Sequence, residues 1–483
     1  EMWMLAKEKR ELRDVELTEP EDRMRILSLH DPWVQPMWSQ LISKFGEGWY
    51  FPIVKNGELA GIIEKWEMSG CVEVREIELS DERLLPELID ALDHMMEFYK
   101  MKGYDILRIT RALGEEIAKS RHLETFLSKG YERVGDFIAK GNFEPVVFTR
   151  DQIMSYIFWK QGIHRDNKFE NVMDAIDKLG GLRSDFEATL KTKVPVSVNR
   201  LRDQGILFYG RPIPEYATFC TLENLAVYKK AKNKRLTEYM RMVLEVVEDR
   251  GPVGRSQLLT LSPLGYGNTV ESLRRLSDGL YVVGTTENGR FGYLSVPDIP
   301  GMTTAEARKI VLKRIIDSFG IFSAERLSAY TKHEYKMEEI RKILRQLERE
   351  GHLAKGFFME GEDTLYWVVK EDLNRIGEIS FNGQFILTPR DNLSLYLRDQ
   401  IKERWKWGHC LVAFDGTEMI GAFKTRFRKH EIVVTDFAGD TTARQILRAF
   451  SIENDIRIVE ERKEMDEWEL MVWYERMHGK ESD

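Results

Sequence analysis

The middle of the chain repeats one order of elements three times, and this repeat restricts the possible folds more than any other feature. Each unit of about 70 residues predicts a helix, a short helix, a longer basic helix, a glycine and then a hairpin of two strands. The closing glycines are Gly205, Gly279 and Gly351, and each fits the position after a helix, where a positive φ ends the helix without a Cβ clash. The middle is therefore predicted to hold three small domains of one kind.

A helix–turn–helix followed by a two-stranded wing is the order of a winged-helix domain. We place the three winged helices at residues 151–233, 234–300 and 301–380. The same order serves nucleic-acid binding in some proteins and protein interaction in others, so both alternatives stay open at this point.

The two ends of the chain resemble each other. Residues 26–66 align with residues 386–426 without a gap, at a constant offset of 360. Asn56-Gly57 and Asp415-Gly416 lie between apolar runs and predict hairpins with type I′ turns. The expected fold class is therefore α+β multidomain, in which the three winged helices are flanked by two related small α+β modules at 23–150 and 381–483. At the same offset residues 1–22 are expected to be the tail of a truncated winged helix or a linker, as in the C-terminal part of a longer protein.

Charge is unevenly distributed along this acidic chain, whose formal net charge is -8. The first 150 residues carry -8, residues 151–300 carry +3 and the remainder carries -3. A polyanion would bind best to the basic middle. The cations predicted to contact phosphates lie on the third helices or in the linker after the first unit: Lys191, Lys193, Arg200, Arg202, Lys230, Lys232, Lys234, Arg235, Arg274, Arg275, Arg341, Lys342 and Arg345.

Three short motifs in this order resemble the winged-helix DNA glycosylases of the YcaQ/AlkZ type and the related C-terminal region of Lhr-type DNA repair helicases. They are Gln161-Gly162 after a predicted helix, Leu179-Gly180-Gly181-Leu182, and the segment from Phe385 to Asp391. The resemblance covers residues 152–437. It implies a DNA repair protein that binds single-stranded, duplex or forked DNA, as the accessory region of an ATP-dependent helicase whose motor lies in the same parent chain.

The resemblance also implies a catalytic position, and here the sequence departs from the family. Asp185 matches the second residue of the glycosylase motif, whereas Arg183 stands where the family has Gln. A guanidinium beside a developing oxocarbenium cation is unfavourable, and we expect little or no glycosylase activity. A monofunctional glycosylase acting on damaged or crosslinked bases is one alternative function. A protein-interaction scaffold without nucleic acid is another.

The N-terminal module resembles the GNAT acetyltransferases in its order of elements, but not in its phosphate-binding loop. The corresponding segment, Ser80 to Leu85, has no glycine and two acidic residues, so no acetyl-CoA site is predicted. No cofactor is expected, and the three distant cysteines and scattered histidines predict no metal site. No P-loop or membrane-length apolar run occurs, and we expect a cytoplasmic protein.

Overall fold

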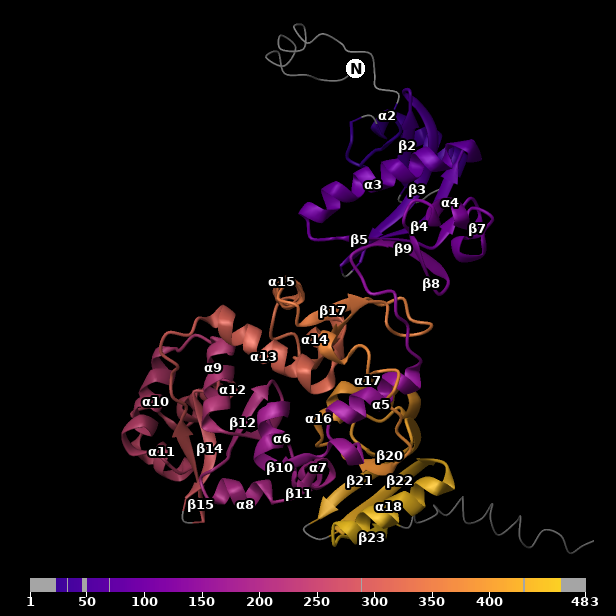
Figure 1. Ribbon diagram of the computed structural model, residues 1–483. Coiled ribbons are helices and arrows are strands. Elements are labelled where there is room, and N and C mark those ends of the chain that lie inside the picture. Colours follow the sequence, from indigo (N-terminus) through magenta and orange to yellow (C-terminus); the bar gives the residue numbers. More distant parts are fainter. Residues whose placement is uncertain are drawn as a thin grey trace, which may run out of the picture. The chain divides into compact units, whose positions relative to one another are not determined.

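The computed structural model describes residues 23–32, 34–45, 50–68, 70–287, 289–428 and 431–461, so the predicted tail at 1–22 lies outside the described residues. The chain forms two compact units. One holds the residues up to 148 together with 354–367, and the other holds 149–353 and the residues from 368 onward. Figure 1 shows the elements of each unit.

The first unit is built on a seven-stranded sheet in the order β1-β2-β3-β4-β5-β9-β8. Helix α3 lies along this sheet (Figure 1), and its apolar positions, including Leu88, Ile89 and Leu92, are buried in the core. The elements are β1 (Arg25–Ile26), α2 (Val34–Phe45), β2 (Tyr50–Lys55), β3 (Glu58–Glu67), β4 (Cys71–Leu79), α3 (Leu85–Met101), β5 (Ile106–Ile109), β6 (Arg111–Ala112), β7 (Glu115–Glu116), α4 (Leu123–Leu127), β8 (Glu132–Val134) and β9 (Phe137–Gly141).

Asp81 caps the short 3-10 turn, Glu82–Leu84, that precedes α3. The Asp81 carboxylate accepts a hydrogen bond from the backbone N–H of Arg83 and pairs with the Arg83 guanidinium. The side chain of Asp81 therefore takes an N–H that a phosphate would use at a helix start. Beyond β5 the chain stays beside β4, since the Leu113 N–H donates to the Ile77 carbonyl.

The C-terminal module repeats the topology of the N-terminal one. Its sheet has the order β19-β20-β21-β22-β23, and its last pair is parallel, as is the pair β4–β5. Helix α18 packs on this sheet through Ala443, Ile446 and Phe450. The elements are β19 (Gln384–Leu387), α16 (Asn392–Tyr396), α17 (Arg398–Trp405), β20 (Leu411–Asp415), β21 (Glu418–Arg428), β22 (Glu431–Gly439), α18 (Thr441–Glu453) and β23 (Arg457–Glu460).

The irregularities of the two sheets also match at the offset of 360. The β2–β3 register shifts at Ile53/Val54, and the β20–β21 register shifts at Ala413/Phe414. The next pairs shift at Glu64/Lys65 and at Lys424/Thr425. A bulge bends a strand locally, so the two sheets are bent at corresponding positions.

The two hairpin turns differ, which corrects one sequence expectation. Asn56 and Gly57 both have positive φ, as the predicted type I′ turn requires. In the second hairpin β20 continues through Asp415, so the central residues are Gly416 and Thr417, and Gly416 alone of the two has a positive φ. A glycine at the first central position is the signature of a type II′ turn.

Between the modules the order of three helices and two strands occurs three times. The first repeat is α6 (Val172–Leu179), α7 (Asp185–Lys191), α8 (Val198–Asp203), β12 (Phe208–Ile213) and β13 (Tyr216–Cys220). The second is α10 (Glu238–Arg250), α11 (Arg255–Leu261), α12 (Tyr266–Asp278), β14 (Val282–Glu287) and β15 (Arg290–Ser295). The third is α13 (Thr304–Phe319), α14 (Ala324–Tyr330), α15 (Met337–Arg349), β17 (Leu353–Gly356) and β18 (Tyr366–Val369). The connecting elements are α5 (Arg150–Lys160), β10 (Phe169–Asn171), β11 (Thr192–Val194), α9 (Leu222–Lys232) and β16 (Ile321–Phe322).

Local sequence signals set the helix boundaries in these repeats. Thr149 and Gln152 form a capping box at the start of α5, and Ser184 caps α7. Gly205 and Gly351 have the expected positive φ, but Gly279 is right-handed and Leu280 takes the positive φ instead. A Cβ at Gly279 would lie 2.9 Å from the Tyr281 ring, so glycine is needed there for space.

The hairpins of the first two repeats join into one antiparallel sheet in the order β13-β12-β14-β15. The contact between them is the pairing of Tyr209 with Gly284. In this joined sheet, one face of β12 and β14 lies opposite helix α12.

Candidate nucleic-acid interface

Asp185, the predicted catalytic residue, is half-buried and holds two helices of its own repeat together. It is the first residue of α7, and its carboxylate accepts hydrogen bonds from the Val198 N–H (2.6 Å) and from Asn199 Nδ2 (2.8 Å) at the start of α8. Both carboxylate oxygens therefore face the N-terminus of the neighbouring helix, which stabilises their negative charge.

The Arg183 guanidinium contacts the C-terminal module and Tyr216, and among the described residues no ion pair joins it to Asp185. Its Nη1 donates to the carbonyl of Asp391 at 3.1 Å, and its guanidinium lies over the Tyr216 ring at 4.9 Å. The Arg183 backbone N–H donates to Glu187 Oε2 at 2.7 Å. The guanidinium is therefore directed toward the C-terminal module and away from the Asp185 carboxylate.

The three short motifs of the sequence meet at a buried ionic network, which we call the junction network: Gln161, Glu187, Lys191 and Asp391. Lys191 Nζ donates to Glu187 Oε1 (2.7 Å), Gln161 Oε1 (2.8 Å) and Asp391 Oδ1 (2.9 Å). The Lys191 side chain is 0 % exposed. Asn392 extends the contact, since its Nδ2 donates to the Gly181 carbonyl. The motifs thus join α5, the first repeat and the C-terminal module.

Burial shapes the protonation of the junction network. Loss of solvation, followed by the neighbouring charge of Asp391, raises the pKa of Glu187. Burial also works against the charged form of Lys191, but the carboxylates of Asp391 and Glu187 outweigh it and raise the pKa of Lys191. Lys191 is therefore a structural cation, and its predicted contact with phosphate is wrong because no part of its side chain reaches solvent.

Lys232 requires the same correction. It is 5 % exposed, and its Nζ donates to the Asp278 carbonyl at 2.9 Å. Burial lowers the pKa of Lys232 to about 8. Because the Lys232 ammonium is buried and hydrogen-bonded to a backbone carbonyl, it cannot contact a DNA phosphate.

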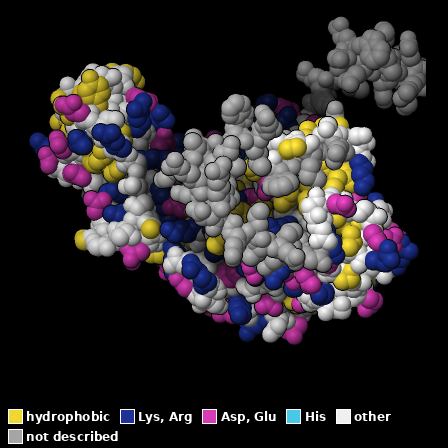
Figure 2. Space-filling model, turned by 90° about the horizontal axis from the view of Figure 1, so that it is seen from above, with side chains coloured by type: hydrophobic (Ala, Val, Ile, Leu, Met, Phe, Trp, Pro, Cys, Tyr) yellow, Lys and Arg dark blue, Asp and Glu magenta, His cyan; other side chains and the backbone are white. Residues whose placement is uncertain are grey.

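Most of the other predicted cations reach the surface but are paired with carboxylates. Glu271 accepts from both Arg274 (2.8 Å) and Arg275 (2.7 Å) on its own helix α12. The further pairs are Lys193 with Glu170, Arg202 with Asp203, Lys234 with Glu334 and Arg341 with Glu325, while Arg345 is half-buried on α15. Figure 2 shows Lys and Arg side chains interspersed with Asp and Glu on the visible face instead of gathered in one basic patch.

Some predicted cations remain available to a ligand. Among the described residues, no ion pair involves Arg200 on α8, Arg235 before α10 or Lys342 on α15, and all three are exposed. Lys230 on α9 is half-buried and likewise has no ion pair within the described ranges.

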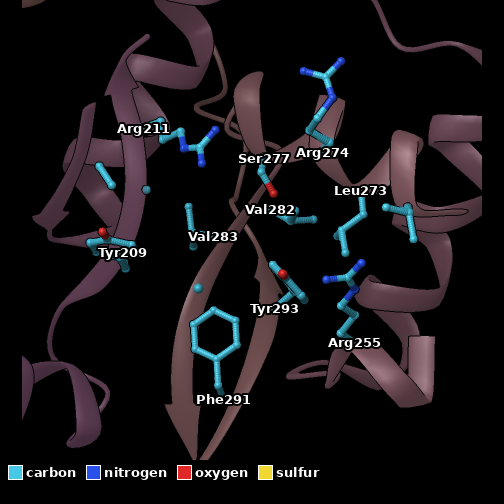
Figure 3. A pocket seen from close by; sticks show the side chains of 14 residues that line it. Tyr209, Arg211, Arg255, Leu273, Arg274, Ser277, Val282, Val283, Phe291 and Tyr293 are labelled. Carbon is cyan, nitrogen blue, oxygen red and sulfur yellow. The ribbon is translucent and has the colours of Figure 1, made fainter. Parts of the chain in front are cut away.

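Sequence reasoning missed two arginines that line a cavity with Arg274, and the joined sheet brings one of them, Arg211, there from the first repeat. Arg211 lies on β12 and Arg255 opens α11, and with Arg274 they line a cavity of about 360 Å³ between the sheet and α12 (Figure 3). Arg211 pairs with Asp278 at 3.2 Å, whereas Arg255 is exposed and enters no ion pair within the described part of the chain. No sequence signal identifies this group, because it depends on the pairing of hairpins from two repeats.

The described part of the chain holds no group of three or more His, Cys, Asp or Glu side chains placed to bind a metal ion. None of its helices is both long and apolar enough to cross a membrane.

Comparison with known proteins gives a fold relationship. Searches against protein families and against curated proteins found no match. Among solved structures, the DNA glycosylase AlkZ of Streptomyces sahachiroi is similar with a TM-score of 0.52 and 13% identity, over 65% of this chain and 100% of that chain. FemX aligns over 88% of this chain and 83% of that chain, but its TM-score of 0.13 and 11% identity carry no argument. About two thirds of the chain therefore has the fold of the AlkZ protein.

Proposed function

We propose that this chain is the DNA-binding winged-helix array of a DNA repair protein. The observation that carries the proposal is the similarity in fold to a DNA glycosylase over the whole length of that protein. The threefold order of three helices and a hairpin supports it, because this is the order of winged-helix domains. Arg200, Arg235, Lys342 and Arg255 supply the cations that would contact the phosphates.

The test is binding of the chain to single-stranded, duplex and forked DNA at two salt concentrations. We expect binding that weakens as salt rises, with little base specificity, since scattered cations contact the backbone and not the base edges. Arg200→Ala combined with Lys342→Ala should weaken binding to every DNA. A protein-interaction scaffold would show no salt-dependent affinity for DNA, and the pairing of Arg274 and Arg275 with Glu271 is the observation that favours this second candidate.

Within this function we further propose the role of a C-terminal accessory region of an Lhr-like ATP-dependent helicase. The order of the motifs at Gln161, Gly180-Gly181 and Asp391 supports the proposal, together with their convergence in the junction network. The reading frame that encodes the chain tests it, because a motor carrying a P-loop is expected upstream of Glu1.

We propose that glycosylase chemistry is weak or absent in this chain. Asp185 is engaged by Val198 and Asn199, and Arg183 stands where a neutral Gln would be needed beside a developing cation. The test is an abasic-site assay on uracil-containing, alkylated and crosslinked duplexes. Base release by the wild type that disappears in Asp185→Ala would overturn this view. Activity gained in Arg183→Gln would show that the fold is retained and that the chemistry was lost at one residue.

A further inference from the structure

The cavity between the joined sheet and α12 combines features that a nucleic-acid base requires. Small residues, Gly210, Ala217 and Gly284, are among those that line it, and the Phe291 ring packs on Gly284. Its volume of about 360 Å³ is within the range of sites that hold small planar ligands, which begins at roughly 300 Å³. Figure 3 shows the arginines and the aromatic rings arranged around strand β14 at Val282 and Val283.

Two aromatic rings at this cavity are exposed although they belong to strands. Phe291 is 49 % exposed and Tyr209 is 37 % exposed. The Phe291 ring lies over Gly284, since a Cβ there would come within 2.7 Å of the ring, and its edge meets Tyr293 at a centroid distance of 5.4 Å. The ring is therefore held against the sheet while about half of the residue is exposed, and a base can stack on an exposed aromatic ring.

Positive charge at the rim matches the phosphate that accompanies a base. Arg211 and Arg274 share the carboxylate of Asp278, at 3.2 Å and 2.8 Å, and this pairing fixes their position. Of the three arginines that line the cavity, Arg255 is the one that forms no ion pair within the described part of the chain. It is the first residue of α11. Its guanidinium is the group available to pair with a phosphate oxygen.

We propose that this cavity binds an unstacked base of single-stranded DNA, with Phe291 as the stacking platform and Arg255 on the adjacent phosphate. The inference rests on the proposed DNA binding and deepens it. A duplex cannot use the cavity, because its bases are stacked on each other and present no free face. The cavity therefore gives the chain a preference for single-stranded regions that its scattered surface cations do not provide.

The experiment compares the affinity of the full chain for a labelled oligothymidine and for a blunt duplex by fluorescence anisotropy. Phe291→Ala is expected to lower the affinity for oligothymidine about tenfold and to leave the affinity for duplex unchanged. Phe291→Trp should retain binding, because it keeps a stacking surface. Arg255→Ala should weaken binding to the single strand and reduce its salt slope by about 0.7.

Tyr239→Ala is the matched control, since Tyr239 is an equally exposed aromatic residue of the same repeat that does not line the cavity. It should change neither affinity. A second readout uses an oligonucleotide carrying 2-aminopurine, whose fluorescence is quenched on stacking. We expect quenching by wild type and by Phe291→Trp, but not by Phe291→Ala.

The outcomes separate this inference from the proposed function. Wild type that binds neither DNA would overturn the proposed function itself. Wild type that binds duplex, with Phe291→Ala losing nothing on oligothymidine or losing equally on both DNAs, would overturn the base site and leave DNA binding intact. Thermal unfolding of each variant distinguishes loss of the site from loss of the fold.

Discussion

At the scale of the residue, burial decides what each predicted cation does. Lys191 and Lys193 lie two positions apart, and sequence reasoning assigned them the same role. Lys191 belongs to the junction network and is fully buried, whereas Lys193 is 48 % exposed and pairs with Glu170 at the surface. The difference depends on Asp391, which is 200 residues away in the sequence and cannot be read from the local pattern.

Replacing Lys191 with Met should lower the free energy of unfolding by about 3–5 kcal/mol, because two buried carboxylates lose their cation. The loss should shrink as the pH falls. Burial already raises the pKa of Glu187 above its ordinary value of 4.5, so its protonated form, which needs no cation, is favoured in the folded chain at low pH. Urea unfolding from neutral to acidic pH measures both effects. Lys193→Met, as control, should lie within about 0.5 kcal/mol of wild type, and an equal loss in the two variants would contradict the assignment.

Lys232 should make the free energy of unfolding increase with pH in the alkaline range. Its pKa of about 8 in the folded chain is below the ordinary 10.5, so between these values the unfolded chain binds more protons and stability rises with pH. The rise attributable to Lys232 is roughly 3 kcal/mol and should be absent in Lys232→Met, while Lys230→Met should keep it. Thermal midpoints measured from pH 7 to the alkaline limit test this. Parallel curves for wild type and Lys232→Met would contradict it.

At the scale of the element, the carboxylate of Glu271 on helix α12 neutralises charge of Arg274 and Arg275 on the same helix. Hydrogen bonds from Arg274 and then Arg275 lower the pKa of Glu271 to about 2, so this carboxylate is ionised at any working pH. Glu271→Gln should therefore free the Arg275 guanidinium, leave Arg274 paired with Asp278 alone, and raise DNA affinity with a steeper salt dependence. Anisotropy titrations at two salt concentrations measure the change. Glu238→Gln, an exposed change on α10, is the control; unchanged affinity in Glu271→Gln would mean that α12 does not face DNA.

Elements set by local signals were predictable, and elements set by pairing across repeats were not. The predicted order of a short helix and then a longer basic helix is found in α14 and α15, where Ser323 caps α14 and an apolar stripe at Ile340, Ile343, Leu344 and Leu347 defines the buried face of α15. The pairing of Tyr209 with Gly284 has no local signal, and the cavity that depends on it was missed. For the same reason the site was predicted less well than the fold: Arg211, from the first repeat, becomes a neighbour of Arg274 only through that pairing.

At the scale of the whole molecule, the same short motifs serve both the resemblance to glycosylases and the internal architecture. Gln161, Glu187 and Asp391 come from three distant segments, and all of them bind the Lys191 ammonium. Gln161 and Asp391, the two motif residues among them, thus help to hold α5, the first repeat and the C-terminal module together. Similarity in these motifs is therefore evidence of fold, and activity has to be argued from Asp185 and Arg183.

The number of available cations predicts how strongly salt weakens the whole interaction. If Arg200, Arg235 and Lys342, the available cations outside the cavity, each neutralise one phosphate, the logarithm of the binding constant for duplex DNA should fall with the logarithm of salt at a slope of about -2.7. Neutralising substitution of any one of them should reduce the slope by about 0.9, whereas Lys193→Ala should not, because Glu170 already compensates that charge. Titrations over several salt concentrations give the slopes. A slope near zero would exclude backbone binding by this chain, and a slope far steeper than about -2.7 would mean that DNA displaces carboxylates such as Glu271 from their arginines.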